Sequence, residues 1–239
     1  MIIRSRHVGI VAVSAEGAAL CYRTICNEGA AEFGVHGHPE VSMHTYSLAE
    51  YMRHIDAGRW DEVGRLMLSS AQKLVQSGAD FLVCPDNTVH QGLDLVRRQS
   101  PAPWLHIAEE VAAAATSAGL RRLGLLGTRY LMEGPVYPSA LAPRGIAWEI
   151  PDDGDRARIN AIIFDELVRG EFRQDSREYV RTAIVKLKTR GCDSVVLGCT
   201  EIPLLISQHD SALPILDSTR TLARAALRES MLNEVPSGR

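Results

Sequence analysis

Short apolar runs and longer amphipathic stretches alternate along the 239 residues of this chain. The runs have the length of buried strands, and the stretches repeat apolar residues every three or four positions, as helices do. In the first half the pattern predicts strands at 7–13, 40–46, 79–84 and 104–107, with one helix at 15–32, more than one helix within 47–77, and one helix at 88–98. In the second half it predicts strands at 122–127, 146–150, 193–197 and 214–216, with one helix at 131–142, more than one helix within 155–190, and a short helix at 200–206. Such alternation predicts an α/β fold with parallel sheets covered by helices on both faces.

Equivalent elements recur at a nearly constant spacing in the two halves. Their first strands begin near Val8 and Arg122, and their third strands are followed by Asp86 and Cys199, at nearly equal offsets (122 − 8 = 114 and 199 − 86 = 113). The alternative is an accidental likeness between two α/β halves. If the unit is duplicated, a pseudo-twofold arrangement sets Asp86 and Cys199 on opposite walls of an interdomain cleft.

Chain order indicates the domain boundaries. A helix from about 107 to 118 links the halves, and a last helix, 218–229, is expected to return to the first. We therefore expect a first domain of residues 1–107 plus 208–239 and a second of residues 108–207. Residues 230–239 are expected to form a frayed tail.

The composition is that of an ordinary soluble protein, with 46% hydrophobic and 23% charged residues. A formal net charge of −3 gives no reason to expect nucleic acid or an anionic membrane as a partner. The N-terminal residues show no signal-peptide pattern, and no apolar stretch approaches the roughly 20 residues that span a bilayer. The five cysteines lack metal-ligand or redox spacing, which predicts a reduced, cytoplasmic setting.

The sequence predicts no cofactor. There is no Gly-x-Gly-x-x-Gly or Walker loop for a nucleotide, and no lysine motif that suggests a Schiff base. His36, His38 and His44 form a histidine-rich stretch without a carboxylate or cysteine ligand set beside it. Solvated loop histidines are therefore favoured over a metal site.

A short motif with a reactive side chain follows the third strand of each half. They are Pro85-Asp86-Asn87-Thr88-Val89-His90 and Gly198-Cys199-Thr200-Glu201-Ile202-Pro203. A thiolate is soft and easily desolvated, and amide donors at a helix start lower its pKa, so Cys199 suits proton removal from carbon. Asp86 can act as the second acid/base group.

The hydrogen-bond donors beside these two groups are Asn87, Thr88 and Thr200, which suit a substrate carboxylate or the enediolate formed from it. Taken alone, Asp86 is more typical of a helix N-cap and Cys199 of packing. Their matched offset favours a functional pair that inverts a stereocentre without a cofactor.

At these residues the chain resembles the aspartate/glutamate racemase family, whose members act without pyridoxal phosphate. The matching blocks are Asn87-Thr88-Val89-His90, Gly124-Leu125-Leu126-Gly127-Thr128, Met132-Glu133-Gly134, Ile162-Ile163-Phe164-Asp165-Glu166-Leu167, Gly198-Cys199-Thr200-Glu201-Ile202-Pro203 and Leu216-Asp217-Ser218-Thr219-Arg220. The resemblance implies two similar domains with four-stranded parallel sheets, an active site between them, and a homodimer. It implies that Cys199 is the second catalytic cysteine. The positions that match the family's α-carboxylate ligands are Asn87, Thr88, Thr128 and Thr200, and Ser14, in the loop after the first strand, is a further candidate.

The chain departs from the family pattern at two points. Asp86 stands where the family has its first catalytic cysteine, and Cys84, two residues earlier, lies roughly 6–7 Å deeper along the strand. The basic residue that binds the distal carboxylate of acidic substrates is missing after the second strand. His44, Arg156 and Arg158 are the candidates to replace it.

Three hypotheses follow for a small carboxylate or amino-acid substrate. The first is a racemase or epimerase that uses Asp86 and Cys199 as unlike bases. The second is a single-cysteine decarboxylase, or a cis–trans isomerase of a dicarboxylic acid. The third is a non-catalytic protein that kept the carboxylate pocket.

Overall fold

The computed structural model describes residues 5–231 and divides into two compact units. The first unit comprises the described chain up to Pro85, then Gly92–His106, and the described residues from Leu222 onward. The second unit comprises Asp86–Gln91 and Ile107–Thr221. The expected C-terminal tail lies outside the described residues from position 232 on. The segment that begins with Asp86 is thus grouped with the second half of the chain.

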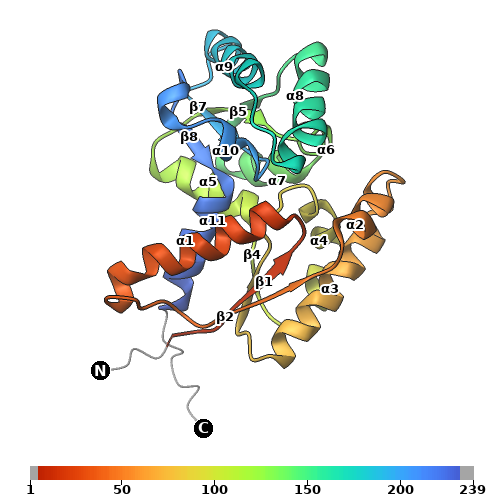
Figure 1. Cartoon of the computed structure of the whole chain (residues 1–239), viewed down its shortest axis with the longest axis vertical. Coiled ribbons are helices and arrows are strands. Elements are labelled where there is room, and N and C mark those ends of the chain that lie inside the picture. Colours follow the sequence, from red (N-terminus) through yellow and green to blue (C-terminus); the bar gives the residue numbers. More distant parts are fainter. Residues whose placement is uncertain (1–4, 232–239) are drawn as a thin grey trace. The chain divides into compact units, whose positions relative to one another are not determined.

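The first unit holds a four-stranded parallel sheet with the strand order β2-β1-β3-β4 (Figure 1). Its strands are β1 (Val8–Ala12), β2 (Val41–Thr45), β3 (Phe81–Val83) and β4 (Trp104–Leu105). The helices that begin in this unit are α1 (Ala15–Phe33), α2 (Leu48–Ile55), α3 (Trp60–Gln76) and η1 (Arg97–Gln99). Two further helices, α4 (His90–Val96) and α11 (Ser218–Ser230), have residues in both units.

The second unit holds a parallel sheet of the same order, β6-β5-β7-β8. Its strands are β5 (Arg122–Leu126), β6 (Ala147–Glu149), β7 (Ser194–Leu197) and β8 (Ile215–Asp217). Its helices are α5 (Ile107–Ser117), α6 (Arg129–Met132), α7 (Val136–Leu141), η2 (Ala142–Arg144), α8 (Asp153–Asp165), η3 (Leu167–Arg169), α9 (Gln174–Thr189), α10 (Ile202–Leu205) and η4 (Gln208–Asp210). The predicted α/β class, with two four-stranded parallel sheets, is confirmed.

Strand alternation explains how the second sheet is covered on both faces. Successive side chains of a strand point to opposite faces. On β7, Val195 and Leu197 belong to the core cluster formed with α8, α9 and α10, whereas Val196 belongs to the cluster formed with α5 and α7. Gly124 of β5 faces α9, where an added Cβ would lie 2.8 Å from Leu187 Cδ1. The glycine therefore allows α9 to approach the sheet closely.

The expected helix at 131–142 is two helices in the structure, α6 and α7. Gly134 and Pro135 separate them. A Cβ at Gly134 would lie 2.3 Å from the carbonyl oxygen of Tyr130, and Pro135 has no N–H to continue a helix. The break ends α6 one turn after Thr128, which is the N-cap of α6.

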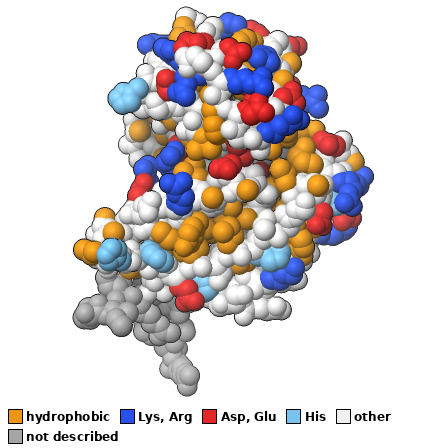
Figure 2. All heavy atoms as spheres, viewed as in Figure 1, with side chains coloured by type: hydrophobic (Ala, Val, Ile, Leu, Met, Phe, Trp, Pro, Cys, Tyr) orange, Lys and Arg blue, Asp and Glu red, His pale blue; other side chains and the backbone are white. Residues whose placement is uncertain are grey.

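Ion pairs cover the solvent face of the helices of the second unit. Over α8 and α9, Lys and Arg side chains are interspersed with Asp and Glu (Figure 2). Lys186 of α9, for example, donates to Asp155 of α8 at 2.7 Å. Among residues 5–231, no helix is long and apolar enough to cross a membrane.

Candidate active site

The loop after β3 packs against the carboxyl ends of the second sheet. Within the second unit, Thr88 Oγ1 lies 3.1 Å from Thr128 Oγ1, which follows β5. Asn87 Nδ2 donates to Ser218 Oγ, which follows β8, at 2.9 Å. The structure thus brings three of the predicted binding residues, Asn87, Thr88 and Thr128, to one edge of this sheet.

Asp86 is a partly buried carboxylate at the start of that loop. Its Oδ1 accepts a hydrogen bond from the backbone N–H of Val89 at 3.2 Å, the N-cap contact that the sequence also allowed. Burial is the main cause that raises the pKa of Asp86 from 3.8 to about 6, and the carboxylate of Glu201 raises it further, while the N–H groups of Val89 and Thr88 lower it. A carboxyl group with a pKa of about 6 can change its protonation state near neutral pH, as a general acid/base must.

His90 fixes the backbone at Asp86. Its ring is fully buried, and its Nε2 accepts from the backbone N–H of Ile107 at 3.4 Å. The proton of a neutral imidazole then lies on Nδ1, which donates to the carbonyl oxygen of Asp86 at 2.7 Å. His90 is therefore a structural anchor of the loop.

Cys199 lies two residues after β7 and is 8% exposed. Its Sγ donates to Glu201 Oε2 at 3.0 Å, and Thr200 Oγ1 donates to the same oxygen at 2.8 Å. Burial, then the carboxylate of Glu201, and to a smaller extent Asp86, raise the pKa of Cys199 well above its ordinary value of 9.0. At neutral pH the sulfur therefore carries its proton.

The site combines a carboxylate and a thiol that differ in protonation state at neutral pH. Asp86 and Cys199 are close enough for their charges to interact, and both interact with Glu201. Above pH 6 the first group is an available base, and the second is an acid with a proton to give. This pair can exchange protons with a carbon centre without a metal or an organic cofactor.

Asn87 is held by two buried residues that the sequence did not single out. Tyr137 OH donates to Asn87 Oδ1 at 2.8 Å, and Asn87 Nδ2 donates to Ser218 Oγ. Ser218 Oγ in turn donates to the carbonyl oxygen of Leu197 at 2.9 Å. These contacts link the loop that follows β3 to the end of β7, and they fix the orientation of the Asn87 amide.

Ser14 belongs to the first unit. Its Oγ accepts from the backbone N–H of Gly17 at 3.2 Å and caps α1. This contact accounts for a serine at that position, and its part in substrate binding stays a prediction.

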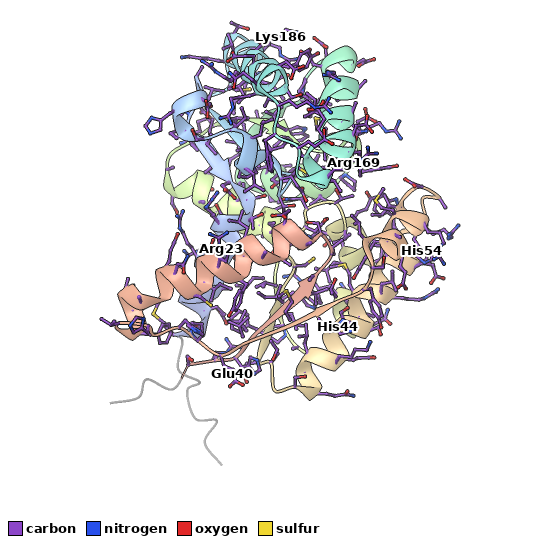
Figure 3. The ribbon with its side chains drawn as sticks, viewed as in Figure 1. Arg23, Glu40, His44, His54, Arg169 and Lys186 are labelled. Atoms are coloured by element: carbon purple, nitrogen blue, oxygen red, sulfur yellow. The ribbon has the colours of Figure 1, made fainter. Side chains whose placement is uncertain are left out.

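The three basic candidates for a distal carboxylate are engaged within their own units. His44 on β2 (Figure 3) accepts from Lys73 Nζ at 3.1 Å through Nε2, and its Nδ1 lies 3.0 Å from Ser70 Oγ. Arg156 donates to Glu133 at 2.9 Å, and also to Asp153 and the carbonyl oxygen of Pro151. Arg158 pairs with Glu166 at 3.8 Å.

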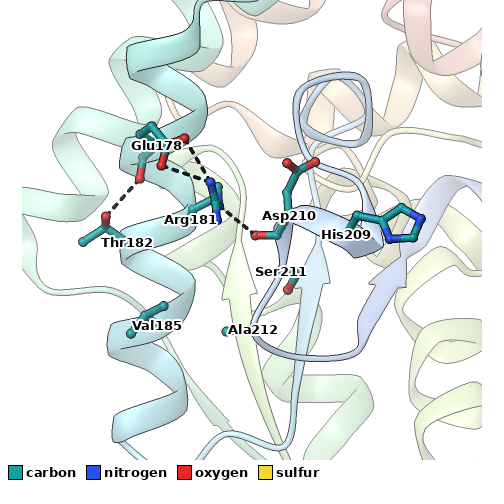
Figure 4. Close-up of a pocket in the computed structure, with 8 residues that line it drawn as sticks. All are labelled: Glu178, Arg181, Thr182, Val185, His209, Asp210, Ser211 and Ala212. Atoms are coloured by element: carbon teal, nitrogen blue, oxygen red, sulfur yellow. Dashed lines mark hydrogen bonds and ion pairs between the residues drawn. The ribbon is translucent and has the colours of Figure 1, made fainter.

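A separate pocket of about 400 Å³ lies in the second unit, between α9 and the residues around η4 (Figure 4). Arg181 lines this pocket, and its guanidinium group donates to Glu178 at 2.9 Å and to the carbonyl oxygen of Asp210 at 3.2 Å. The lining contains none of the predicted site residues. Within residues 5–231, no three His, Cys, Asp or Glu side chains are grouped so that they could hold a metal ion.

Fold and site together define a two-sheet α/β protein with an ionisable carboxylate and a thiol at strand ends. The family model for Asp/Glu/Hydantoin racemase matches residues 10–226. The chain belongs to this family, as its motifs predicted, and the family's named members are amino-acid racemases, which are isomerases.

Individual relatives agree with this assignment. The broad specificity amino-acid racemase RacX of Bacillus subtilis is 24% identical over 167 residues, which are 70% of this chain and 72% of RacX. The crystal structure of a candidate Asp/Glu racemase from Yersinia pestis is 32% identical, with a TM-score of 0.87 over 95% of this chain and all of that one. An aspartate racemase homologue from Pyrococcus horikoshii, PH1733, is 26% identical with a TM-score of 0.81, again over 95% of this chain and 100% of that one.

Proposed function

We propose that this protein is a cofactor-independent racemase or epimerase that moves the α-proton of an amino acid or a related carboxylic acid between Asp86 and Cys199. The observation that carries the proposal is the pairing of these two groups. An ionisable carboxylate with a pKa of about 6 interacts with a protonated, buried thiol in one compact unit.

The proposed reaction needs two proton transfers. Asp86 Oδ takes the proton from one face of the α-carbon, and the electron pair of the broken C–H bond passes into the substrate carboxylate as an enediolate. The S–H bond of Cys199 then breaks, and its proton forms a new C–H bond on the opposite face. The site ends with a protonated Asp86 and a thiolate, which return to the starting state by exchange with solvent.

Hydroxyl and amide groups at the sheet edge would hold the substrate carboxylate. Thr88 Oγ1 and Thr128 Oγ1 share a hydrogen bond of 3.1 Å, in which one hydroxyl donates to the other, so one hydroxyl proton of the pair is left to donate to the substrate. An asparagine amide carries two N–H groups, and the bond of Asn87 to Ser218 uses one of them. We assign the second to the substrate. Donors that face the developing enediolate charge lower the barrier to proton removal.

The decisive experiment is racemisation of a panel of single-enantiomer amino acids by the wild type, Cys199→Ala and Asp86→Asn. Loss of one acid/base group costs about 100- to 10,000-fold in rate, so both variants should be nearly inactive on the substrate that the wild type converts. Arg181→Lys, in the pocket beside η4, is the matched control and should retain activity. Full activity in either site variant would refute the assignment.

A single-thiol reaction is the second candidate function. It is favoured by one observation, a carboxylate at the position where the family resemblance implies a first cysteine. Cys199 would then protonate an enediolate formed by decarboxylation of a substituted malonate, or would react with an unsaturated diacid. Release of CO₂ from malonates without inversion of any amino acid would favour this alternative. If Asp86→Cys increases racemisation, this chain has lost the two-thiol mechanism, and the pair of Asp86 and Cys199 does not replace it.

We also propose that the protein is a cytoplasmic homodimer. The family resemblance supports the dimer, and the five cysteines, which form no disulfide among residues 5–231, fit a reducing compartment. Light scattering of the purified protein tests the dimer, because a monomer mass at micromolar concentration would contradict it.

A further inference from the structure

Glu201 is a buried carboxylate that the sequence placed in a motif but not in the site. It is 3% exposed. It stands at the N-cap position of α10, yet it makes no side-chain cap to that helix. Its Oε2 instead accepts hydrogen bonds from Cys199 Sγ and Thr200 Oγ1. A buried carboxylate in such a position is costly to keep unless it interacts with the groups around it.

We propose that Glu201 is a positioning residue that keeps the proton on Cys199 in the resting enzyme, so that Cys199 is the acid and Asp86 the base for the enantiomer whose α-proton faces Asp86. This inference rests on the proposed function. Its physical basis is the short distance of 3.0 Å between Sγ and Oε2. Loss of the thiol proton would set two negative charges at that distance in a buried site, where charges are weakly screened.

Asp86 and burial act in the same direction, whereas the backbone N–H of Glu201, which hydrogen-bonds to the sulfur, lowers the pKa of Cys199. The charged group that interacts with Cys199 besides Glu201 is Asp86, also an acid, and Thr200 is a neutral donor to Glu201. Burial adds to the effect, because it disfavours the thiolate. When Asp86 has taken the substrate proton it becomes neutral, which removes one of the two negative charges just as Cys199 must release its own proton. The transfer to the α-carbon therefore becomes easier after the first step than before it.

The test is a titration of the Cys199 thiol that needs no substrate. The ultraviolet absorbance of the thiolate is recorded against pH, and the spectrum of the same protein with Cys199→Ser is subtracted, so that the other cysteines and the tyrosines cancel. In the wild type we expect ionisation of Cys199 above pH 9. In Glu201→Gln, which keeps a hydrogen-bond acceptor of the same size but removes the charge, we expect at least about tenfold more thiolate at a given pH.

Glu166→Gln is the matched control. Glu166 is a second buried glutamate of the same unit, 4% exposed, and accepts from Ser176 Oγ at 2.5 Å. Loss of its charge should leave the Cys199 titration unchanged. If Glu201→Gln does not fold, the wild-type titration alone decides, because a thiolate at pH 7 would overturn the inference.

The outcomes separate this inference from the proposed function. An unshifted Cys199 titration in a Glu201→Gln variant that still racemises would overturn the role of Glu201 and leave the proposed function intact. A shifted titration in a protein whose wild type racemises nothing would overturn the proposed function, and with it the direction of proton transfer assigned here. A shift together with a fall in racemisation rate above pH 8, seen in Glu201→Gln but not in Glu166→Gln, supports both.

Discussion

Replacing Asp86 with asparagine should stabilise the protein at alkaline pH. Asparagine has the same shape and keeps an oxygen that can accept from Val89 N–H, but it carries no charge. Burial raises the pKa of Asp86 in the folded state to about 6 from 3.8. A raised folded pKa contributes stability that is complete below pH 3.8 and is lost as the pH rises through 6. The asparagine variant does not lose it.

The size of the effect follows from the two pKa values. At about 1.4 kcal/mol for each tenfold change in proton affinity, the wild type loses about 3 kcal/mol of unfolding free energy between acid and alkaline pH. About 1 kcal/mol of this is already lost at pH 4.5. Between pH 4.5 and pH 8, therefore, the stability difference between Asp86→Asn and the wild type should grow by about 2 kcal/mol.

Urea denaturation of both proteins, followed by circular dichroism at the two pH values, measures this difference. Other titrating groups are common to both proteins, so their effects cancel. If the Asp86→Asn and wild-type values run parallel from pH 4.5 to 8, Asp86 is not desolvated and the acid/base assignment loses its basis.

Three further predictions concern rate and packing. The kcat/KM of racemisation should rise with a midpoint near pH 6, because Asp86 must be ionised, and should not fall below pH 9, because Cys199 stays protonated. Both enantiomers should give the same profile, since the equilibrium constant of racemisation is one. Tyr137→Phe removes the donor to Asn87 and should cost about 1–3 kcal/mol of stability, measured in urea, and lower kcat. Gly124→Ala should cost about 1–3 kcal/mol, because its methyl group would lie 2.8 Å from a leucine of α9.

Each of these predictions has a result that would contradict it. A rate already at its maximum at pH 5 would place the base elsewhere than at Asp86. A Tyr137→Phe variant with unchanged stability and kcat would mean that the hydrogen bond to Asn87 is dispensable. Gly154→Ala is the control for Gly124, because its Cβ would meet only an oxygen at 3.7 Å, and equal costs for both would refute the packing argument.

The fold could be predicted because its signals are local. Buried strands such as Ser194–Leu197 are continuous apolar runs, and the helices between them repeat their apolar residues at a helical period. The single expected helix at 131–142 was wrong, although Gly134 and Pro135 were a visible signal for a break. Strand order within each sheet is not local, and it was not predicted; the family resemblance implied only that each domain holds a four-stranded parallel sheet.

The site was predictable only in part. Asp86 and Cys199 follow strands and carry reactive groups, which a sequence displays directly. The contact between Tyr137 and Asn87 joins positions 50 residues apart, and no local sequence pattern predicts it. The role of Glu201 depends on which way its side chain turns from the start of α10. The position of this glutamate, two residues after the reactive cysteine, was nevertheless a visible signal for a carboxylate near the thiol.

The most direct test of the central claim is racemisation in deuterium oxide. One enantiomer of the amino acid that the protein converts is incubated with the protein in D₂O. At low conversion the two enantiomers are separated, and the deuterium content of each is measured by mass spectrometry. If Asp86 removes the proton on one face and Cys199 delivers a deuteron on the other, the product enantiomer carries one deuterium at the α-carbon and the remaining substrate carries almost none. Product without deuterium, or substrate that gains deuterium without inversion, would contradict proton transfer between these two groups.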